Sequence, residues 1–358
     1  MPIFRPDSRR PARADVSDFV LLRAPGKSPR LIQITFQKGI YLPEIDLWLD
    51  PPHSREKAFI SHAHSDHVGR HREVICTRLT QNLMNLRNAA GRRTQFSDLE
   101  YGQALQLSGF ELTALSAGHI MGSAMLHVRR IRDGASLLYT GDYKLRAGLT
   151  GQPAELKEAD TLIMETTFGL RKYVFPTAAE VTRMIGDFVS KTFTEGGVPI
   201  LLGYSLGKAQ EIVAALRGIQ NPVMLHPHIE KVSALLAPHL GPMPEIRAWD
   251  ECNPRGHVLV LPPHVPQIQS LKEKFKCKVA MVSGWGLDPS AKYRYRTDEV
   301  FPLSDHADYP QLIETVERVK PKLIYTVHGF TREFAADLRA KGLDARALGQ
   351  EEQLDLSL

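Results

Sequence analysis

Seven consecutive residues, Ser61-His62-Ala63-His64-Ser65-Asp66-His67, restrict the fold more than any other stretch of this sequence, because they place three imidazoles and a carboxylate side by side. They follow the apolar run 57–60, which is typical of a short buried strand, so the cluster should lie where a strand ends. On an extended backbone His62 and His64 project to the same side, whereas Asp66 and His67 lie beyond the turn and can face a second point. Two groups of ligands predict two metal ions. A surface loop that is merely rich in histidine is the alternative, and the cost of desolvating such residues beside an apolar strand weighs against it.

Length and composition indicate an ordinary globular protein. The 358 residues suffice for two structural units with ample core, and 43% are hydrophobic while 24% are charged. No apolar run approaches the roughly 18 residues that cross a bilayer, so no membrane association is expected. The first residues lack the apolar stretch of a secretory signal, and we expect a cytoplasmic protein. Three cysteines (Cys76, Cys252 and Cys277) without a CxxC pair support neither a disulfide framework nor a zinc ribbon.

The charge balance favours a polyanionic partner. The net charge is +5 and the pI is near 9.0. Residues 1–28 are rich in Pro and Arg and have no apolar period, which predicts a flexible basic arm. A solvated tail and an arm that touches nucleic acid both fit this composition.

Two apolar-polar alternations precede the histidine cluster. Residues 31–36 and 45–50 alternate with the period of a strand and predict paired strands that lead into the cluster. Asp50 ends the second run. It is a candidate acceptor for the N–H of a ligand histidine, a role that carboxylates commonly fill in metal sites, or else a turn residue before Pro51-Pro52.

Two further ligand candidates follow predicted strands. His119 lies between Gly118 and Gly122, which would let the backbone approach a crowded site closely. Residues 125–139 predict a hairpin that turns at Asp133-Gly134 and leads to Asp142. A carboxylate beside a glycine at the end of a buried strand is well placed to bridge two metals.

The second half of the chain has a different pattern. Short apolar runs at 198–204, 223–226, 257–261 and 279–283 are each followed by a helical pattern or a Pro-rich loop. This arrangement predicts a small doubly wound parallel α/β unit inserted into the first fold. The chain then returns through a predicted helix over 309–319, a strand over 322–327 and a closing helix over 332–341. We expect a cleft between the two units, which is a common place for a substrate to bind.

These residues carry a family resemblance. Asp50, the HAHSDH run, His119 and Asp142 resemble motifs one to four of the metallo-β-lactamase superfamily. Residues 160–169, which contain Glu165, are similar to motif A of the β-CASP nucleases, residues 304–308 with His306 to motif B, and residues 325–329 with His328 to motif C. The resemblance spans residues 50–330.

The resemblance implies an α/β fold, namely a metallo-β-lactamase αββα sandwich with an inserted β-CASP domain that has a small parallel sheet. The expected parts are the arm 1–28, the first part of the metallo-β-lactamase domain at 29–172, the insertion at 173–298 and the C-terminal part at 299–358.

At the level of the whole chain the sequence is similar to the bacterial ligase-associated DNA exonucleases, in segments 203–210, 303–309 and 348–352. This similarity implies a DNA exonuclease of DNA repair that acts on single-stranded or end-bearing duplex DNA, with a functional association with a DNA ligase and a helicase. His328 favours an RNA substrate instead, because RNA-processing members of the wider family carry histidine at motif C while the DNA crosslink-repair branch usually carries an aliphatic residue.

The resemblance also implies a set of metal ligands. Nitrogen-rich ligation suits Zn, whereas a mixed nitrogen and oxygen site holds Zn or Mn. Two metals about 3.5–4 Å apart can hold a hydroxide between them that attacks the phosphodiester. The first site comprises His62, His64 and His119; the second comprises Asp66, His67 and His328; Asp142 bridges them.

Outside the metal set, His306 is expected near the scissile phosphate, where it would bind a phosphate oxygen or protonate the leaving group. Glu165 would hold His306 in place. The alternatives are a histidine that supports the fold and an exposed acid at a strand end.

A loop in the inserted unit is a candidate phosphate site. Tyr204, Ser205, Gly207 and Lys208 precede a predicted helix over 209–217, and amides at a helix N-terminus favour anions. The loop lacks the first glycine of GxxxxGK[ST], and a helix cap with an exposed lysine is the alternative.

Three other functions stay open at this point. They are an RNA exo- or endonuclease of the same fold, a non-catalytic nucleic-acid-binding subunit, and hydrolysis of a small thioester or lactam. Intact ligands weigh against the second, and the inserted unit would have no purpose in the third.

Overall fold

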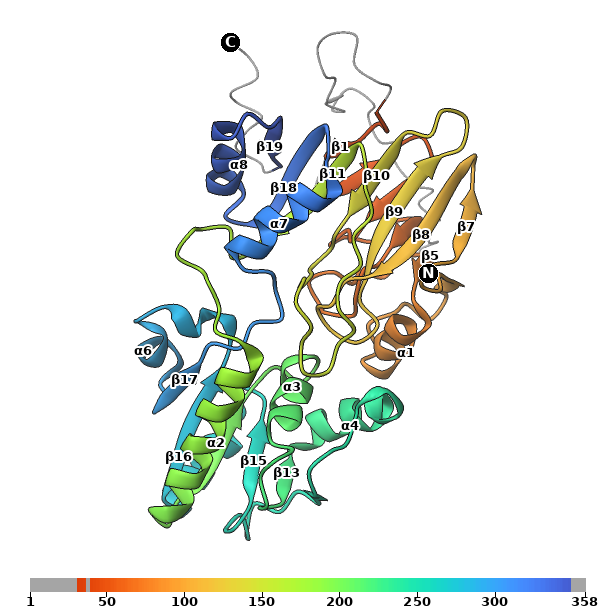
Figure 1. Ribbon diagram of the computed structural model, residues 1–358. Coiled ribbons are helices and arrows are strands. Elements are labelled where there is room, and N and C mark those ends of the chain that lie inside the picture. Colours follow the sequence, from red (N-terminus) through yellow and green to blue (C-terminus); the bar gives the residue numbers. More distant parts are fainter. Residues whose placement is uncertain (1–30, 37–38, 349–358) are drawn as a thin grey trace, which may run out of the picture.

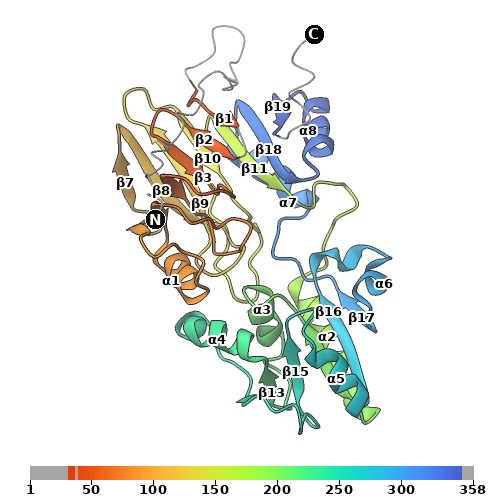
Figure 2. The ribbon, with the colours of Figure 1, turned by 180° about the vertical axis from the view of Figure 1, so that it is seen from behind.

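The computed structural model describes residues 31–36 and 39–348, so the predicted basic arm at 1–28 and all but the first residue of segment 348–352 lie outside the described residues. Figure 1 shows two sheets in the upper half of the molecule and a third in the lower half. The chain enters the lower half in green and returns to the upper half in blue, and the reverse view in Figure 2 agrees.

The first sheet contains six strands in sequence order. β1 to β3 are antiparallel neighbours and β3 to β6 are parallel. Alternation in β3 buries Leu47 and Leu49 and leaves Trp48 partly exposed, as the predicted strand pattern requires. The strands are β1 Thr35–Phe36, β2 Ile40–Leu42, β3 Leu47–Leu49, β4 Lys57–Phe59, β5 Glu73–Cys76 and β6 Gln95–Asp98.

The second sheet contains seven strands in the order β19-β18-β11-β10-β9-β8-β7. β9 and β10 pair antiparallel on either side of Asp133-Gly134, which confirms the predicted hairpin. β10, β11, β18 and β19 are parallel. The strands are β7 Ala104–Leu107, β8 Phe110–Ser116, β9 Ala124–Arg130, β10 Ser136–Tyr139, β11 Thr161–Thr166, β18 Leu323–Gly329 and β19 Ala345–Ala347.

The two sheets share one apolar core, and helices cover their outer faces. Leu47 and Phe59 of the first sheet pack with Leu126 and Ile163 of the second. Helix α1 (Arg78–Leu86) covers the first sheet, while α7 (Tyr309–Val319) and α8 (Thr331–Ala340) cover the second. The Thr77 hydroxyl accepts from the Thr80 amide and caps α1. The result is the four-layer αββα sandwich that the resemblance implies.

The third sheet is wholly parallel, in the order β14-β13-β15-β12-β16-β17. The four predicted strands of this unit are confirmed, and the sequence pattern missed two short edge strands, β14 and β17. The strands are β12 Val198–Leu202, β13 Val223–Leu225, β14 Ile246–Arg247, β15 Val258–Leu261, β16 Cys277–Val282 and β17 Glu299–Phe301.

Helices cover both faces of the third sheet. Helices α2 (Ala178–Thr194), α3 (Lys208–Ala215) and α4 (Pro227–Leu236) pack on one face and α5 (Gln267–Lys274) on the other. Short helices follow at η2 (Ala237–His239), η3 (Gly284–Leu287) and α6 (Ala291–Tyr295).

All strands of the third sheet lie in sequence between β11 and β18 of the second, as expected of an inserted unit. The boundaries 29–172, 173–298 and 299–358 stay a prediction. Leu206 and Val232 of the insertion pack with Leu83 of α1, so the two units share an apolar contact beside the cleft. Among the described residues, no helix has both the length and the apolar character needed to cross a membrane.

Candidate metal centre and the adjoining cleft

The candidate ligands gather at the carboxyl ends of strands from both sheets of the sandwich. His62 and His64 follow β4, His119 follows β8 and Asp142 follows β10. The Ala124 amide donates to the Ser61 carbonyl at 2.8 Å, a contact that ties the end of β4 to the opposite sheet. Loops that are far apart in the chain therefore meet at one point.

Four ligand atoms converge at this point. His64 Nδ1 lies 3.0 Å from His62 Nε2 and 3.1 Å from His119 Nε2. Asp142 Oδ2 lies 3.6 Å from His62 Nε2 and 3.8 Å from His119 Nε2. Ligands about 2.0–2.1 Å from a tetrahedral zinc are about 3.4 Å from one another, and the four distances scatter around that value. The donor set therefore fits Zn in both chemistry and spacing.

The second ring nitrogen of each of these histidines is held by a hydrogen bond. His62 Nδ1 lies 2.9 Å from Ser61 Oγ, His64 Nε2 lies 3.2 Å from the Leu206 carbonyl, and His119 Nδ1 lies 2.9 Å from the Asp305 carbonyl. Metal-ligating histidines nearly always donate their other N–H in this way, which fixes the tautomer and the ring orientation. Of these acceptors, Leu206 belongs to the inserted unit and Asp305 to the segment that returns from it.

Asp50 is the common acceptor of the site. One oxygen accepts the Ser61 amide at 2.7 Å, and the other accepts the hydroxyls of Ser61 and Tyr139 at 2.5 and 2.8 Å. The second oxygen also lies 3.0 Å from His67 Nδ1. Asp50 thus lies where the sequence expected an acceptor for a ligand histidine, and its contacts orient His67 and, through Ser61, His62.

A glycine makes the close approach of two ligand loops possible. Gly141, beside Asp142, has φ +52°, and a Cβ there would lie 2.6 Å from both Cβ and Oγ of Ser61. A side chain at this position would therefore push the Asp142 loop away from the loop that carries His62.

Burial and neighbouring charge keep His62, His119 and Asp142 in the form that binds metal. Burial lowers the pKa of His62 well below its ordinary value and that of His119 to about 3, so both imidazoles are neutral at physiological pH. Burial alone would raise the pKa of Asp142, but the nearby His67 lowers it well below the ordinary range, and the carboxylate stays charged.

The second predicted site is more open. His67 Nε2 lies 3.3 Å from Asp142 Oδ2 and 3.7 Å from Asp66 Oδ2. The Asp66 side chain is 78% exposed, and the exposed ring of His328 lies 5.4 Å from that of His67 between centroids. The structure thus brings Asp142 and His67 together and leaves Asp66 and His328 at the rim, where the ligand atom of His328 is not within the buried cluster.

His306 faces the metal cluster from the opposite wall of the site. Its Nδ1 lies 2.9 Å from Glu165 Oε1, and its ring centroid lies 4.7 Å from that of His119. Glu165 is fully buried and also accepts the amides of Tyr143 and Thr167 at 3.0 and 3.1 Å. Burial alone would lower the pKa of His306, but the charge of Glu165 raises it to about 10. Glu165 therefore orients His306 and favours its protonated form.

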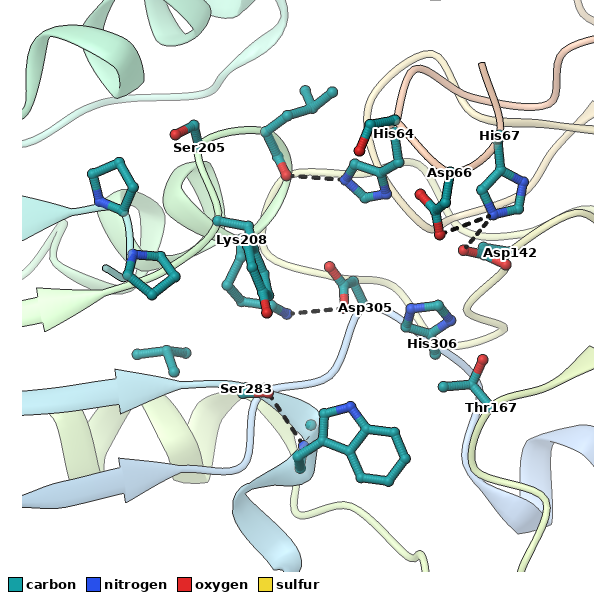
Figure 3. Close-up of a pocket in the computed structure, with 18 of the residues that line it drawn as sticks. His64, Asp66, His67, Asp142, Thr167, Ser205, Lys208, Ser283, Asp305 and His306 are labelled. Carbon is teal, nitrogen blue, oxygen red and sulfur yellow. Dashed lines mark hydrogen bonds and ion pairs between the residues drawn. The ribbon is translucent and has the colours of Figure 1, made fainter. Parts of the chain in front are cut away.

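The metal cluster opens into a cavity of about 580 Å³ between the sandwich and the inserted sheet. Figure 3 shows His64, Asp66, His67 and Asp142 on one side, Lys208 and Ser205 on the other, and His306 between them. Aromatic side chains also line it: Tyr204, which is 58% exposed, Phe168 and Trp285.

The structure corrects the expectation for Lys208. This lysine is buried rather than exposed, and its Nζ donates to the Leu303 carbonyl at 2.9 Å and lies 3.1 and 3.3 Å from carboxylate oxygens of Glu211 and Asp305. Burial alone would lower the pKa of Lys208, but Asp305 and Glu211 raise it. Its charge is already matched by the protein, so it is not a free phosphate contact.

Of the other residues of the expected phosphate loop, one is bound within the protein and two face the cavity. The Gly207 amide donates to Gln210 Oε1 at 2.8 Å, so this amide is also used within the protein. Tyr204 and Ser205 line the cavity and keep their access to it.

Sequence reasoning missed the charged network that Lys208 joins. Lys144 donates to the Ser304 carbonyl at 2.6 Å and lies 3.7 Å from Glu211. The positions of Lys144, Glu211 and Asp305 in the sequence show no regular spacing that would predict their contact. The one signal in the sequence was that Asp305 belongs to the segment 304–308, which was interpreted for His306.

Comparisons with known proteins agree with this geometry. Residues 294–348 match the family described as the Zn-dependent metallo-hydrolase RNA specificity domain, a segment that contains His306 and His328. A protein of Opitutus terrae named as a probable DNA ligase is 43% identical over 91% of this chain and 32% of its own length. An RNase J-like protein of Methanocaldococcus jannaschii is 30% identical over 51% of this chain and 50% of its own length.

Two more distant matches cover most of both chains. RNase aCSPSF2 of Saccharolobus solfataricus is 23% identical over 84% of this chain and 74% of its own. A crystal structure of a protein of unknown function from Enterococcus faecalis superposes with a TM-score of 0.56 and 14% identity, over 82% of this chain and 79% of its own, which shows a shared fold. The chain spans only a third to a half of the length of the first curated relatives.

Proposed function

Since this chain belongs to the β-CASP family of metallo-β-lactamase-fold proteins, we propose that it is a metal-dependent nuclease, and more specifically a DNA exonuclease of DNA repair. The observation that carries the proposal is the ligand cluster. His62, His64 and His119 turn one nitrogen each toward Asp142 while the other nitrogen of each is held by the protein.

The candidate ligands would form two metal sites, and Asp50 would orient one of the ligands. The donors His62, His64 and His119 would hold one divalent cation, and His67, Asp66 and His328 would hold a second, with Asp142 shared. Zn or Mn bound there supplies a nucleophile from water at neutral pH and neutralises charge on phosphate oxygens. Asp50 keeps His67 oriented through the 3.0 Å contact with its Nδ1.

His306 is proposed to act on the substrate rather than on a metal. Its protonated ring, held by Glu165, would donate to a phosphate oxygen or give a proton to the leaving oxygen. His306 lines the cavity, so a phosphodiester placed beside the ligand cluster is within its reach.

Nucleic acid suits the cavity better than a small substrate. Tyr204 and Trp285 offer aromatic faces in a cavity that runs between two units, and aromatic faces stack with any base. The similarity to a probable DNA ligase over 91% of this chain supports DNA as the substrate and a role in repair.

RNA is the second candidate. It is favoured by the match of residues 294–348 to an RNA specificity domain and by the relatives named as RNases, together with the position of His328 at the cavity. The location in the cytoplasm and the association with a DNA ligase and a helicase stay predictions of the sequence resemblance.

One panel of substrates tests the proposal. Single- and double-stranded DNA and RNA of one length, with 5′-phosphate or 5′-hydroxyl ends, are incubated with the protein loaded with Zn or with Mn. We expect nucleotides to be released from DNA ends and no release after chelation. A His119→Ala variant, purified identically, is the control for contaminating nucleases. Equal or faster degradation of RNA would make the protein a ribonuclease, and activity that survives in the control variant would refute the site.

Metal content gives an independent readout. We expect two ions per chain in the wild type and one in His328→Ala, because only the second set loses a ligand. A wild type that holds at most one ion under metal-replete conditions would contradict the two-metal arrangement.

A further inference from the structure

A second cavity, of about 620 Å³, lies on the sandwich unit outside the cleft. It is formed by the segments that precede β4, β5 and β6. Five of its ten lining residues are arginines and one is an acid; the arginines are Arg55, Arg70, Arg72, Arg92 and Arg93. We call this cavity the arginine groove.

Most of the positive charge in the arginine groove is unmatched. Arg72 pairs with Glu56 at 2.8 Å. Arg70, Arg92 and Arg93 are exposed, and within the described part of the chain none has a carboxylate within ion-pair distance. Unpaired guanidinium groups that share one concave surface repel each other, and a bound polyanion would relieve that repulsion.

Arg55 adds an independent observation. Its guanidinium lies 3.8 Å above the Trp48 ring, which fixes its orientation. Its Nε is buried and has no hydrogen-bond acceptor among the described residues. Buried donors without an acceptor are rare, and an anionic oxygen in the groove would supply one.

The arginine groove is close to the metal centre along the chain. Arg70 is three residues after the candidate ligand His67, so their Cα atoms are at most about 11 Å apart. Arg87 lines the metal cavity and is followed five residues later by Arg92, a span of at most about 18 Å. Helix α1, which ends next to Arg87, contacts α4 of the insertion, so α1 lies beside the inserted unit.

These spans match a short stretch of nucleic acid. One strand of B-form DNA advances about 3.4 Å per nucleotide, so the groove begins within about three to five nucleotides of the residues that line the metal cavity. Guanidinium forks bind phosphate oxygens in pairs, which makes arginine well suited to a backbone contact that ignores base sequence.

We propose that the arginine groove binds the phosphate backbone of the substrate strand several nucleotides away from the bond that is hydrolysed. This inference rests on the proposed nuclease function. It assigns the groove no role in chemistry, so it should affect long substrates and leave very short ones unchanged.

The test is the double variant Arg92→Ser/Arg93→Ser, assayed on two single-stranded DNA substrates. A dinucleotide has only the one phosphodiester that is hydrolysed and so offers the groove no further phosphate, whereas an oligonucleotide of about twelve nucleotides extends past the groove. The matched control is Arg183→Ser/Lys191→Ser on α2, which removes the same charge from exposed positions of the inserted unit.

We expect the affinity for the longer strand to fall about tenfold at low salt, with the slope of log K against log salt reduced by about 1.4, or about 0.7 for each lost phosphate contact. Turnover of the dinucleotide and the thermal unfolding midpoint should match the wild type. The control variant should match the wild type on both substrates.

Three outcomes would overturn the inference. They are an unchanged affinity for the longer strand, an equal loss on the dinucleotide, and an equal loss in the control variant, which would make the effect one of net charge. A wild type that hydrolyses neither substrate would instead refute the proposed nuclease function, so the two failures are distinguishable.

Discussion

Two loops of this molecule follow short parallel strands in the same way and differ in where their polar side chains point. The ligand loop 61–67 follows the short parallel strand β4, and the loop 203–208 follows the short parallel strand β12. Both lie at the carboxyl ends of their sheets, where ligands of α/β proteins commonly bind. The first turns its polar side chains to a common point in the cavity, while the second turns its lysine inward.

The difference comes from where the partners of each polar group lie. His62 is oriented by Ser61, its neighbour in sequence, and Ser61 by Asp50 eleven residues away. Lys208 is bound by Leu303 and Asp305, close to a hundred residues later. A cluster of metal ligands can be recognised from sequence because its members lie close together in the chain. The role of a single lysine cannot, because its partners lie far away in the sequence.

The largest expected effect is the loss of turnover on replacing His306, which faces the ligand loop. His306→Ala should keep both metals and lose roughly 10²- to 10⁴-fold in turnover, the usual scale for a general acid or an oxyanion donor. Metal content and single-turnover rates measure the two properties separately. Loss of an ion would make His306 a ligand, a role its proximity to His119 and Asp305 also permits, and near-normal turnover would end its catalytic assignment.

The next effect concerns Lys208. Lys208→Met leaves the partly buried Asp305 without its lysine and leaves Glu211 with Lys144 alone, and should cost up to about 3 kcal/mol of the free energy of unfolding. Chemical denaturation measures the loss. Lys208→Met/Glu211→Gln removes one charge of each sign and should cost less. Unchanged stability of both variants would contradict the structural role of Lys208, and weaker DNA binding by Lys208→Met without loss of stability would make Lys208 a phosphate contact.

Asp50 provides a test of the ligand loop itself. Asp50→Asn keeps the size of the side chain but weakens the acceptor of the His67 N–H, and should lower metal affinity by about 10- to 100-fold. Competition with a chromogenic chelator measures this affinity. Thr113→Val, which lies on β8 away from the cluster, is the control for general effects on the sandwich. Unaltered affinity would leave Asp50 as a turn residue.

The smallest effect is expected at the tip of the second loop. Tyr204→Ala should weaken binding of single-stranded DNA by about 1 kcal/mol, the low end for a stacked base, because the ring is more than half exposed. Tyr204→Phe keeps the aromatic face and should bind like the wild type. Fluorescence anisotropy in the presence of chelator measures both, and equal weakening in the two variants would favour a hydroxyl contact over stacking.

Much of the fold could be predicted because buried strands and amphipathic helices leave periodic patterns. Helix α7 begins and ends at Tyr309 and Val319 as predicted, since Asp308 caps it and Lys320 ends it in a left-handed conformation. The strands β14 and β17 were missed, because two or three partly exposed residues at a sheet edge have no period to detect.

The metal-binding side chains of the candidate site could be predicted from the sequence, but the groups that accept their hydrogen bonds could not. The HAHSDH run and Asp142 were identified by residue type and order. That His64 donates to the Leu206 carbonyl could not be inferred, because any residue provides a backbone carbonyl and only the packing of two units selects this one.

The acceptor of His64 couples two equilibria. Leu206 belongs to the inserted unit, so opening of the cleft would withdraw the acceptor of one metal-binding imidazole. A metal that binds more tightly to the closed form must, by thermodynamic reciprocity, stabilise the closed form by the same free energy. Metal loading in this protein is then also a measure of how firmly its two halves are held together.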